Sequence, residues 1–169
     1  MIRILVIGIE LVLSFLLQSA VFPHAELAGV VPDILMILVV TTAYTKGIYP
    51  GLFTGLFAGL LVDFMYGDVI GICALLYMFI GYVNGYSNKI YDRDDYTIPL
   101  ILIALSEFVY SFFYYILEFL MRGRLNLGYY AYRIMLPKVI YTLVMGVIFY
   151  KLFLMVHVGI SKLLKQEDY

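Results

Sequence analysis

Acidic side chains stand inside several long apolar segments of this sequence. Glu10, Asp33, Asp63, Glu107 and Glu118 each have mainly hydrophobic neighbours. Paired carboxylates can carry out proton chemistry. These acids lie in different segments, so the sequence alone does not place any two together. No nucleophile–base pair, phosphate-binding loop or metal-binding motif is found. We therefore expect no catalytic residue, no metal site and no cofactor.

The composition predicts that the segments carrying these acids are membrane helices. The chain is 64% hydrophobic and 14% charged, with a mean hydropathy of +0.97. Soluble domains are about 25% charged, and a spanning helix needs about 20 mainly apolar residues. We expect an all-α integral membrane protein with a single transmembrane domain over residues 1–169 and about six spans. The expected spans are 4–22, 31–45, 50–66, 70–86, 98–121 and 134–158.

Glycines in the third and fourth spans have the spacing of a close helix contact. Gly51, Gly55 and Gly59 repeat every four residues, and Asp63 continues this spacing. Residues at i and i+4 lie on one face of a helix, and small residues there let two membrane helices approach closely. Gly81 and Gly85 give the next span a similar face. The glycines either pack inside the protein or meet a helix of a partner.

Two stripes of polar residues run along apolar spans. A carboxyl at membrane depth costs about 2.5–3.5 kcal/mol on the insertion scale, so each stripe should face the interior of the bundle. Such a stripe either orients its helix by packing or contacts a partner or ligand. The stripes are Glu10, Ser14 and Gln18 on the first span, and Glu107, Ser111 and Glu118 on the fifth.

The second span begins with Pro32 followed by Asp33. Proline is pre-shaped for the first turn of a helix, since its missing N–H has no partner there. An aspartate beside it can accept hydrogen bonds from the free N–H groups and complements the helix dipole. Capping alone explains Asp33. A role as a polar anchor for a partner, which Asp63 could share, is the alternative.

The distribution of lysine and arginine predicts the orientation, because basic residues accumulate on the cytoplasmic side. Glu10 interrupts the first apolar run, so we expect a retained span and not a cleaved signal peptide. Both termini are expected in the cytoplasm, with Asp33 and Asp63 near the outer face and Glu10 deeper. The basic residues assigned inside are Arg3, Lys46, Lys89, Arg93, Lys151, Lys162 and Lys165; those assigned outside are Arg122, Arg124, Arg133 and Lys138.

Taken together, these motifs resemble the MreD family of rod shape-determining proteins. The resemblance is close over residues 15–86 and looser over 130–155, where Leu136-Pro137 and Tyr141 fit the family pattern. Gln18 near the end of the first span also fits. The motifs are Val31-Pro32-Asp33-Ile34-Leu35, Gly47, Gly51-x3-Gly55-x3-Gly59-Leu60-Leu61-x-Asp63, Gly67, Gly71 and Gly81-Tyr82-x2-Gly85.

The resemblance implies a non-catalytic scaffold of the bacterial cell-elongation machinery in the cytoplasmic membrane. The implied direct partner is MreC, a single-span protein with an extracytoplasmic domain. The actin-like MreB, the glycosyltransferase RodA and a penicillin-binding transpeptidase are implied as further, indirect partners, and no nucleic acid is implied. The expected role is to help organise peptidoglycan synthesis and rod cell shape. Close contact at the glycines and polar anchoring at Asp33 and Asp63 would give helix recognition within the membrane.

A second function stays open on the same plan of spans. Six membrane helices are also similar to the substrate-binding subunits of energy-coupling-factor vitamin transporters, which is an analogy of fold alone. The chain would then be a solute- or vitamin-binding membrane subunit of a transporter. A tightly bound small molecule would favour this function, and a bound membrane protein would favour the scaffold.

Overall fold

The structure is an all-helical membrane protein. The computed structural model describes residues 2–21, 24, 31–67, 70–90, 97–119, 123 and 127–167, and each regular element among them is a helix. Four helical segments of this described part are long and apolar enough to cross a bilayer: Ile2–Val21, Ile48–Tyr66, Thr97–Leu117 and Gly128–Lys165. These segments agree with the membrane character that the composition predicts.

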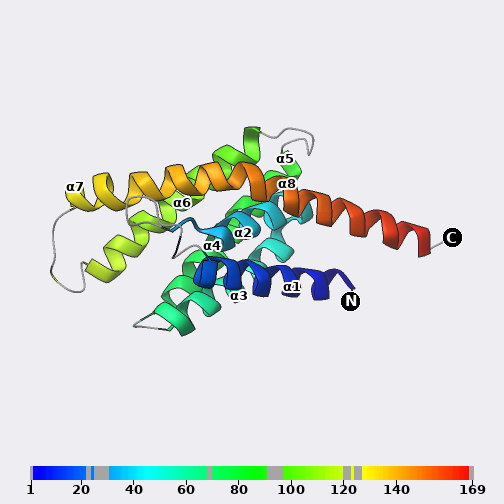
Figure 1. Cartoon of the computed structure of the whole chain (residues 1–169), viewed down its shortest axis with the longest axis horizontal. Coiled ribbons are helices and arrows are strands. Elements are labelled where there is room, and N and C mark those ends of the chain that lie inside the picture. The colour runs from blue at the N-terminus through cyan, green and yellow to red at the C-terminus, as the bar shows by residue number, and fades with distance from the viewer. Residues whose placement is uncertain are drawn as a thin grey trace.

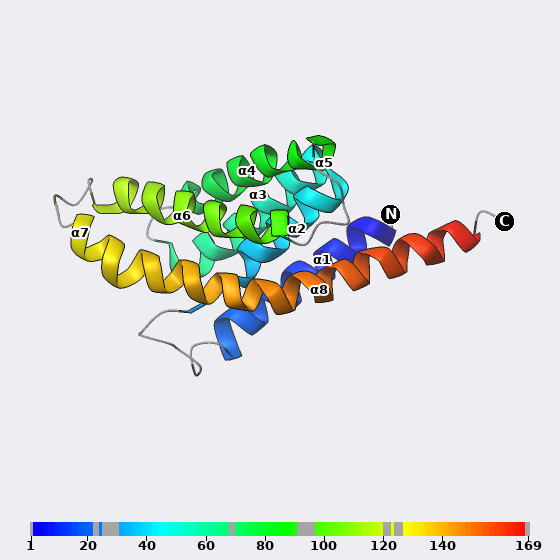
Figure 2. The ribbon, with the colours of Figure 1, turned by 90° about the horizontal axis from the view of Figure 1, so that it is seen from above.

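Figures 1 and 2 show the helices as a bundle in which the start of α1 and the end of α8 lie at the same end of the molecule. Helix α8 runs along the length of the bundle, and α1 lies beside its second half. The elements are α1 (Ile2–Leu16), the π-helical turn η1 (Leu17–Val21), α2 (Ile34–Lys46), α3 (Ile48–Tyr66), α4 (Ile72–Gly85), α5 (Ser87–Ile90), α6 (Thr97–Phe119), α7 (Leu127–Tyr130), the π-helical turn η3 (Ala131–Met135) and α8 (Leu136–Glu167).

Helix α2 forms the centre of the bundle. Every residue from Ile34 to Tyr44 is buried, because α1, α3, α4, α6 and α8 all contact this helix. Its sequence is apolar on all sides, as expected of a helix without a solvent-facing or lipid-facing stripe. Its 13 residues extend about 20 Å, which is less than the roughly 30 Å of a hydrocarbon core. The helix therefore depends on its longer neighbours to separate it from lipid.

The predicted start of the second span was three residues too early. Pro32 was expected in the first helical turn, but it precedes the N-cap residue Asp33, and the helix begins at Ile34. The backbone of Asp33 is not helical, since its side chain turns back to accept a hydrogen bond from Met36. An N-cap residue has non-helical backbone angles, so the helix begins after Asp33 and the preceding proline lies outside it.

Helices α3 and α4 pack backbone to backbone through a glycine seam. At each seam glycine, an added Cβ would lie under 3.0 Å from a backbone atom of the opposite helix, a separation that real Cβ atoms essentially never show. Any side chain would therefore force the helices apart. The two faces that the sequence predicts as small thus meet each other inside the protein. The seam consists of Gly51, Gly55 and Gly59 in α3 and Gly81 and Gly85 in α4.

Two further glycines allow the tight connections beside this pair. Gly47 is the single residue between α2 and α3, and its φ of +106° lies in the region that favours glycine. Gly71 precedes α4 with a φ of +114°. The single-residue link holds α2 and α3 as consecutive antiparallel neighbours.

The last helical segment, which consists of α7, η3 and α8, extends beyond both ends of the span predicted for 134–158. Helix α8 continues to Glu167, beyond residue 158, where the predicted span ends. No proline interrupts the chain after Pro137, and the polar side chains of this last stretch are compatible with an exposed helix. Residues 127–133 were expected in a loop but are helical. The turn η3 precedes Pro137, whose missing N–H removes a regular helical bond there.

The loop predicted over residues 87–97 is also partly helical, because α5 covers Ser87–Ile90. Residues 91–96 of that loop lie outside the described part of the chain, as does most of the predicted loop at 23–29.

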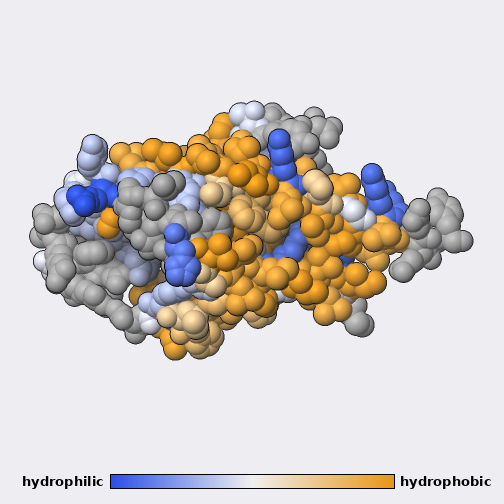
Figure 3. Space-filling model, in the orientation of Figure 1, coloured by the Kyte–Doolittle hydropathy of each residue, from blue (hydrophilic) through white to orange (hydrophobic). Residues whose placement is uncertain are grey.

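The outer surface of the bundle is apolar. Large hydrophobic side chains are exposed along α1, α3, α4, α6 and α8, including Phe57 at 55% and Leu105 at 56% relative exposure. Figure 3 shows one face of the molecule, on which hydrophobic residues dominate. Exposed apolar patches of this extent mark contact with membrane or protein in place of water. Together with the long apolar helices, they identify the outer surface as lipid-facing.

The glycine seam predicts that Gly55→Leu destabilises the protein. A leucine there has no room against the backbone of Tyr77, so we expect a loss of about 1–3 kcal/mol or more in the free energy of unfolding. Gly8→Leu is the matched control, because nothing lies within 4 Å of a Cβ at Gly8 on α1. Thermal unfolding of both variants in detergent measures the difference, and equal melting temperatures would contradict the seam.

Candidate functional site

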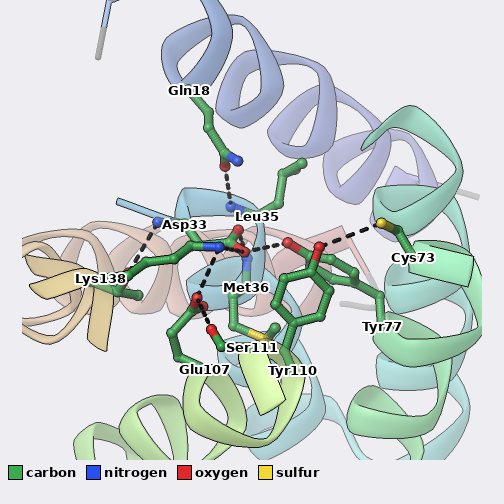
Figure 4. Close-up of polar contacts among 11 residues, drawn as sticks. Gln18, Asp33, Leu35, Met36, Cys73, Tyr77, Glu107, Tyr110, Ser111 and Lys138 are labelled. Carbon is green, nitrogen blue, oxygen red and sulfur yellow. Dashed lines mark hydrogen bonds and ion pairs between the residues drawn. The ribbon is translucent and has the colours of Figure 1, made fainter. Parts of the chain in front are cut away.

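The first turn of α2 is held by polar groups from other helices. Asp33 Oδ1 accepts a hydrogen bond of 2.9 Å from the N–H of Met36, and Gln18 Oε1 accepts one of 3.1 Å from the N–H of Leu35. The N–H of Asp33 itself donates to Thr142 Oγ1 at 3.1 Å. The first N–H groups of a helix have no partner within the helix, and a buried end must find partners elsewhere. Figure 4 shows Gln18 reaching this turn from one side.

Charged groups meet at the same point. Lys138 of α8 places its Nζ 3.1 Å from Glu107 Oε1 and 4.0 Å from Asp33 Oδ2. The hydroxyl of Tyr77 donates a hydrogen bond to Asp33 Oδ2. The side chain of Lys138 is 23% exposed, while those of Asp33 and Glu107 are 2% and 0% exposed. Buried charges require partners of opposite sign and further hydrogen bonds. Lys138 supplies the opposite charge, and Tyr77 supplies a hydrogen bond to Asp33.

Aromatic rings and small polar groups enclose these charges. Lys138 Nζ lies 5.0 Å from the centre of the Tyr110 ring, within the range of a cation–π contact. Tyr110 packs edge to face with Tyr77, and its hydroxyl lies 3.4 Å from Cys73 Sγ. We name the polar core the Asp33 cluster, which consists of Gln18, Asp33, Tyr77, Glu107, Ser111, Lys138 and Thr142.

Asp63 has a separate structural role at the start of α4. Its carboxylate accepts hydrogen bonds from the backbone N–H groups of Gly71, Cys73 and Ala74, at 2.9, 3.1 and 3.0 Å. Asp63 is 1% exposed. The residue therefore joins the end of α3 to the first turn of α4, directly after the glycine seam. Both oxygens of its carboxylate accept hydrogen bonds inside the protein.

A second polar contact lies near the opposite end of α2. Glu10 Oε2 of α1 lies 2.9 Å from His157 Nε2 of α8, and His157 Nδ1 lies 3.2 Å from the hydroxyl of Thr45 in α2. Glu10 and His157 are 7% and 4% exposed. This Glu10 cluster (Glu10, Thr45 and His157) ties the first and last helices to the central one. Ser14, which is 2% exposed, lies on the same inward face of α1 as Glu10.

The predicted site residues thus divide among three places. Gln18, Asp33, Glu107 and Ser111 come together in the Asp33 cluster, where Ser111 Oγ lies 3.5 Å from Glu107 Oε1. The stripe on the first span divides, because its Glu10 joins the Glu10 cluster. The glycines and Asp63 belong to the α3–α4 pair. The side chain of Glu118 lies outside the described part of the chain.

Sequence reasoning missed five members of these clusters, and one of them is Thr45 of the Glu10 cluster. Lys138 was assigned to the outer side of the membrane by charge counting. Its position at the start of an apolar helix, in a chain whose other apolar segments contain acids, is a signal of an internal ion pair. Tyr77, Thr142 and His157 carry no signal that separates them from interfacial or packing residues. Their roles depend on which helices are neighbours.

The arrangement fixes helices relative to one another. Each carboxylate discussed above has a donor or a cation at hydrogen-bond distance. Among the described residues, no three His, Cys, Asp or Glu side chains gather in a group that could hold a metal ion. What these groups do in the structure is orient α1, α4, α6 and α8 around α2.

Comparison with family models decides the family. The model described as rod shape-determining protein MreD matches residues 1–163, which include both clusters and the glycine seam. The chain belongs to the MreD family. No match is found among the curated proteins or the solved structures. Membership implies a role in determining rod shape, and MreD is a family of shape-determining membrane proteins.

The Asp33 cluster predicts that Lys138→Met destabilises the fold. Loss of the ammonium leaves two buried carboxyls without a cation. We expect a cost near the lower end of roughly 3–5 kcal/mol, because the carboxyls can take up protons. Lys151→Met on the exposed side of the same helix is the control and should change stability by no more than about 0.5 kcal/mol. Thermal unfolding in detergent compares them, and a Lys138 variant as stable as the control would refute the role.

The cap at α4 predicts a graded effect at Asp63. In Asp63→Ala, three backbone N–H groups lose their acceptor, at a cost of about 1–3 kcal/mol. Asp63→Asn keeps one acceptor oxygen and should lie between the alanine variant and the wild type. Hydrogen exchange of the Gly71–Ala74 amides should quicken in the same order. Unchanged exchange in Asp63→Ala would show that the cap is dispensable.

Proposed function

We propose that the protein crosses the membrane six times, with α1–η1, α2, α3, α4, α6 and α8 as spans and both termini in the cytoplasm. The start of α1 and the end of α8 lie at one end of the bundle, which an even number of crossings requires (Figures 1 and 2). Arg3 in α1 and Lys162 and Lys165 in α8 lie toward this end. Basic residues favour the cytoplasmic side, which supports the orientation. The short helix α2 is compatible with crossing because the other helices enclose it from Ile34 to Tyr44.

We propose that the chain is a non-catalytic scaffold of the bacterial cell-elongation machinery in the cytoplasmic membrane. The observation that carries this proposal is the MreD family match over residues 1–163. Its direct partner is MreC, and through MreC it acts with MreB, RodA and a penicillin-binding transpeptidase. Its contribution is to help organise peptidoglycan synthesis. The bundle suits a scaffold, because buried polar contacts fix the helices and leave an apolar outer surface for contact with another membrane segment.

The interior contacts change where the partner should bind. The seam glycines are filled by backbone from the neighbouring helix, and Asp33 and Asp63 are engaged by internal donors. A partner helix therefore binds an outer face of the bundle. In lipid, the hydrophobic effect does not drive two helices together, because the acyl chains are as apolar as the side chains. Binding therefore depends on packing against exposed residues such as Phe57.

Co-purification tests the proposal. The full chain carrying an affinity tag is expressed with MreC, extracted in mild detergent, and analysed by mass spectrometry for proteins and for small molecules. We expect MreC in stoichiometric amount and no tightly bound vitamin. If a vitamin were bound and MreC were absent, the proposed scaffold function would be rejected in favour of a solute-binding subunit of a transporter.

Variants in the same experiment separate folding from binding. Gly55→Leu should lower the recovery of MreC only as far as it lowers the amount of folded protein, because the seam lies inside. Gly8→Leu should keep the fold. If Gly55→Leu stayed fully folded but lost MreC, the seam would be a partner contact after all.

A further inference from the structure

The Asp33 cluster contains more acid than base. Asp33 and Glu107 are two carboxyls, and Lys138 is one ammonium within 4.0 Å of both. With all three ionised, the cluster has a net charge of −1. Both carboxyls are almost entirely excluded from solvent, at 2% and 0% exposure. The charge lies in the middle of a helix bundle whose outer surface is apolar.

One atom of the cluster has no hydrogen-bond partner. Glu107 Oε1 faces Lys138 and Ser111, but Glu107 Oε2 is fully buried and has no hydrogen-bond partner among the described residues. An ionised carboxylate oxygen without a donor is among the most costly groups to bury. A protonated oxygen in the same place carries no charge, so its burial costs much less.

The groups around the cluster do not supply a second positive charge. Helix α4 contributes Tyr77 and Cys73, and α6 contributes Tyr110 and Ser111. Helix α8 contributes Lys138 and Thr142, and η1 contributes the amide of Gln18. Lysine 138 is thus the sole cation that reaches the two carboxyls within the described parts of these elements.

We propose that Asp33 and Glu107 together bind one proton, which makes the cluster with Lys138 electrically neutral. The carboxyl left ionised pairs with the ammonium, and the protonated one is a neutral group. The proton is thus a structural ligand that joins the start of α2 to α6 and α8. This site is independent of which partner the protein binds.

Infrared spectroscopy of the full chain in lipid bilayers at neutral pH tests the site. The wild type should show the C=O stretching band of a protonated carboxyl. Asp33→Asn and Glu107→Gln should each remove this component, because either change leaves one carboxylate paired with Lys138. Lys138→Met should increase the band, since both carboxyls then need a proton. Glu10→Gln is the matched control, a buried carboxyl in the separate Glu10 cluster, and it should leave this component in place.

Two results would overturn the proposal. One is a wild-type spectrum identical to those of Asp33→Asn and Glu107→Gln, with all three folded by circular dichroism. The other needs no variant: carbon-13 NMR of wild-type protein labelled at aspartate and glutamate carboxyls, in which every buried carboxyl has the shift of an ionised group at neutral pH. Glu10 Oε1 is also buried without a hydrogen-bond partner among the described residues, so the protonated shift must remain in Glu10→Gln. A carboxyl carbon that keeps this shift in Glu10→Gln would support the site even if Asp33→Asn or Glu107→Gln failed to fold.

Discussion

The structure depends on the complete burial of one short helix. Helix α2 contacts neither lipid nor water from Ile34 to Tyr44, so its first N–H groups cannot be hydrated. Asp33, Gln18 and the surrounding helices supply the missing acceptors. Because the acceptors come from η1 and the N-cap, and the charges around them from α6 and α8, satisfying the end of α2 also positions those elements. A single local requirement thus organises several long-range contacts.

The α3–α4 pair is held together by close backbone packing and not by a polar cluster. Two apolar helices in lipid gain little from hiding side chains, so the glycine seam brings their backbones together and gains dispersion contacts instead. Asp63 then secures the turn by capping α4. The pair packs against α2, and Cys73 and Tyr110 connect the cap of α4 to the rings around the Asp33 cluster. The packed α3–α4 pair and the polar Asp33 cluster are therefore connected inside the bundle.

For a shape-determining membrane protein, this division between interior and surface has a functional consequence. The polar residues that first suggest a binding site are used to hold the bundle together. The surface that remains is a set of apolar faces, well suited to lipid and to other membrane helices. Under the proposed scaffold function, recognition of a partner depends on the shape of these faces, and the interior contacts fix the helices that form them.

The sequence by itself determined the class of the molecule and several of its local features. High hydropathy required membrane helices, the four-residue glycine spacing predicted a close contact, and Pro32-Asp33 predicted a capped helix start. Each follows from periodicity or from chemistry within a few residues. Only the tertiary structure decided that the glycines face α4, that Asp63 caps α4, and that Asp33 and Glu107 share Lys138. Asp33 and Lys138 stand about 100 residues apart, and an ion pair between them depends on which helices are neighbours. No local pattern encodes that choice, because it results from the packing of all the helices at once.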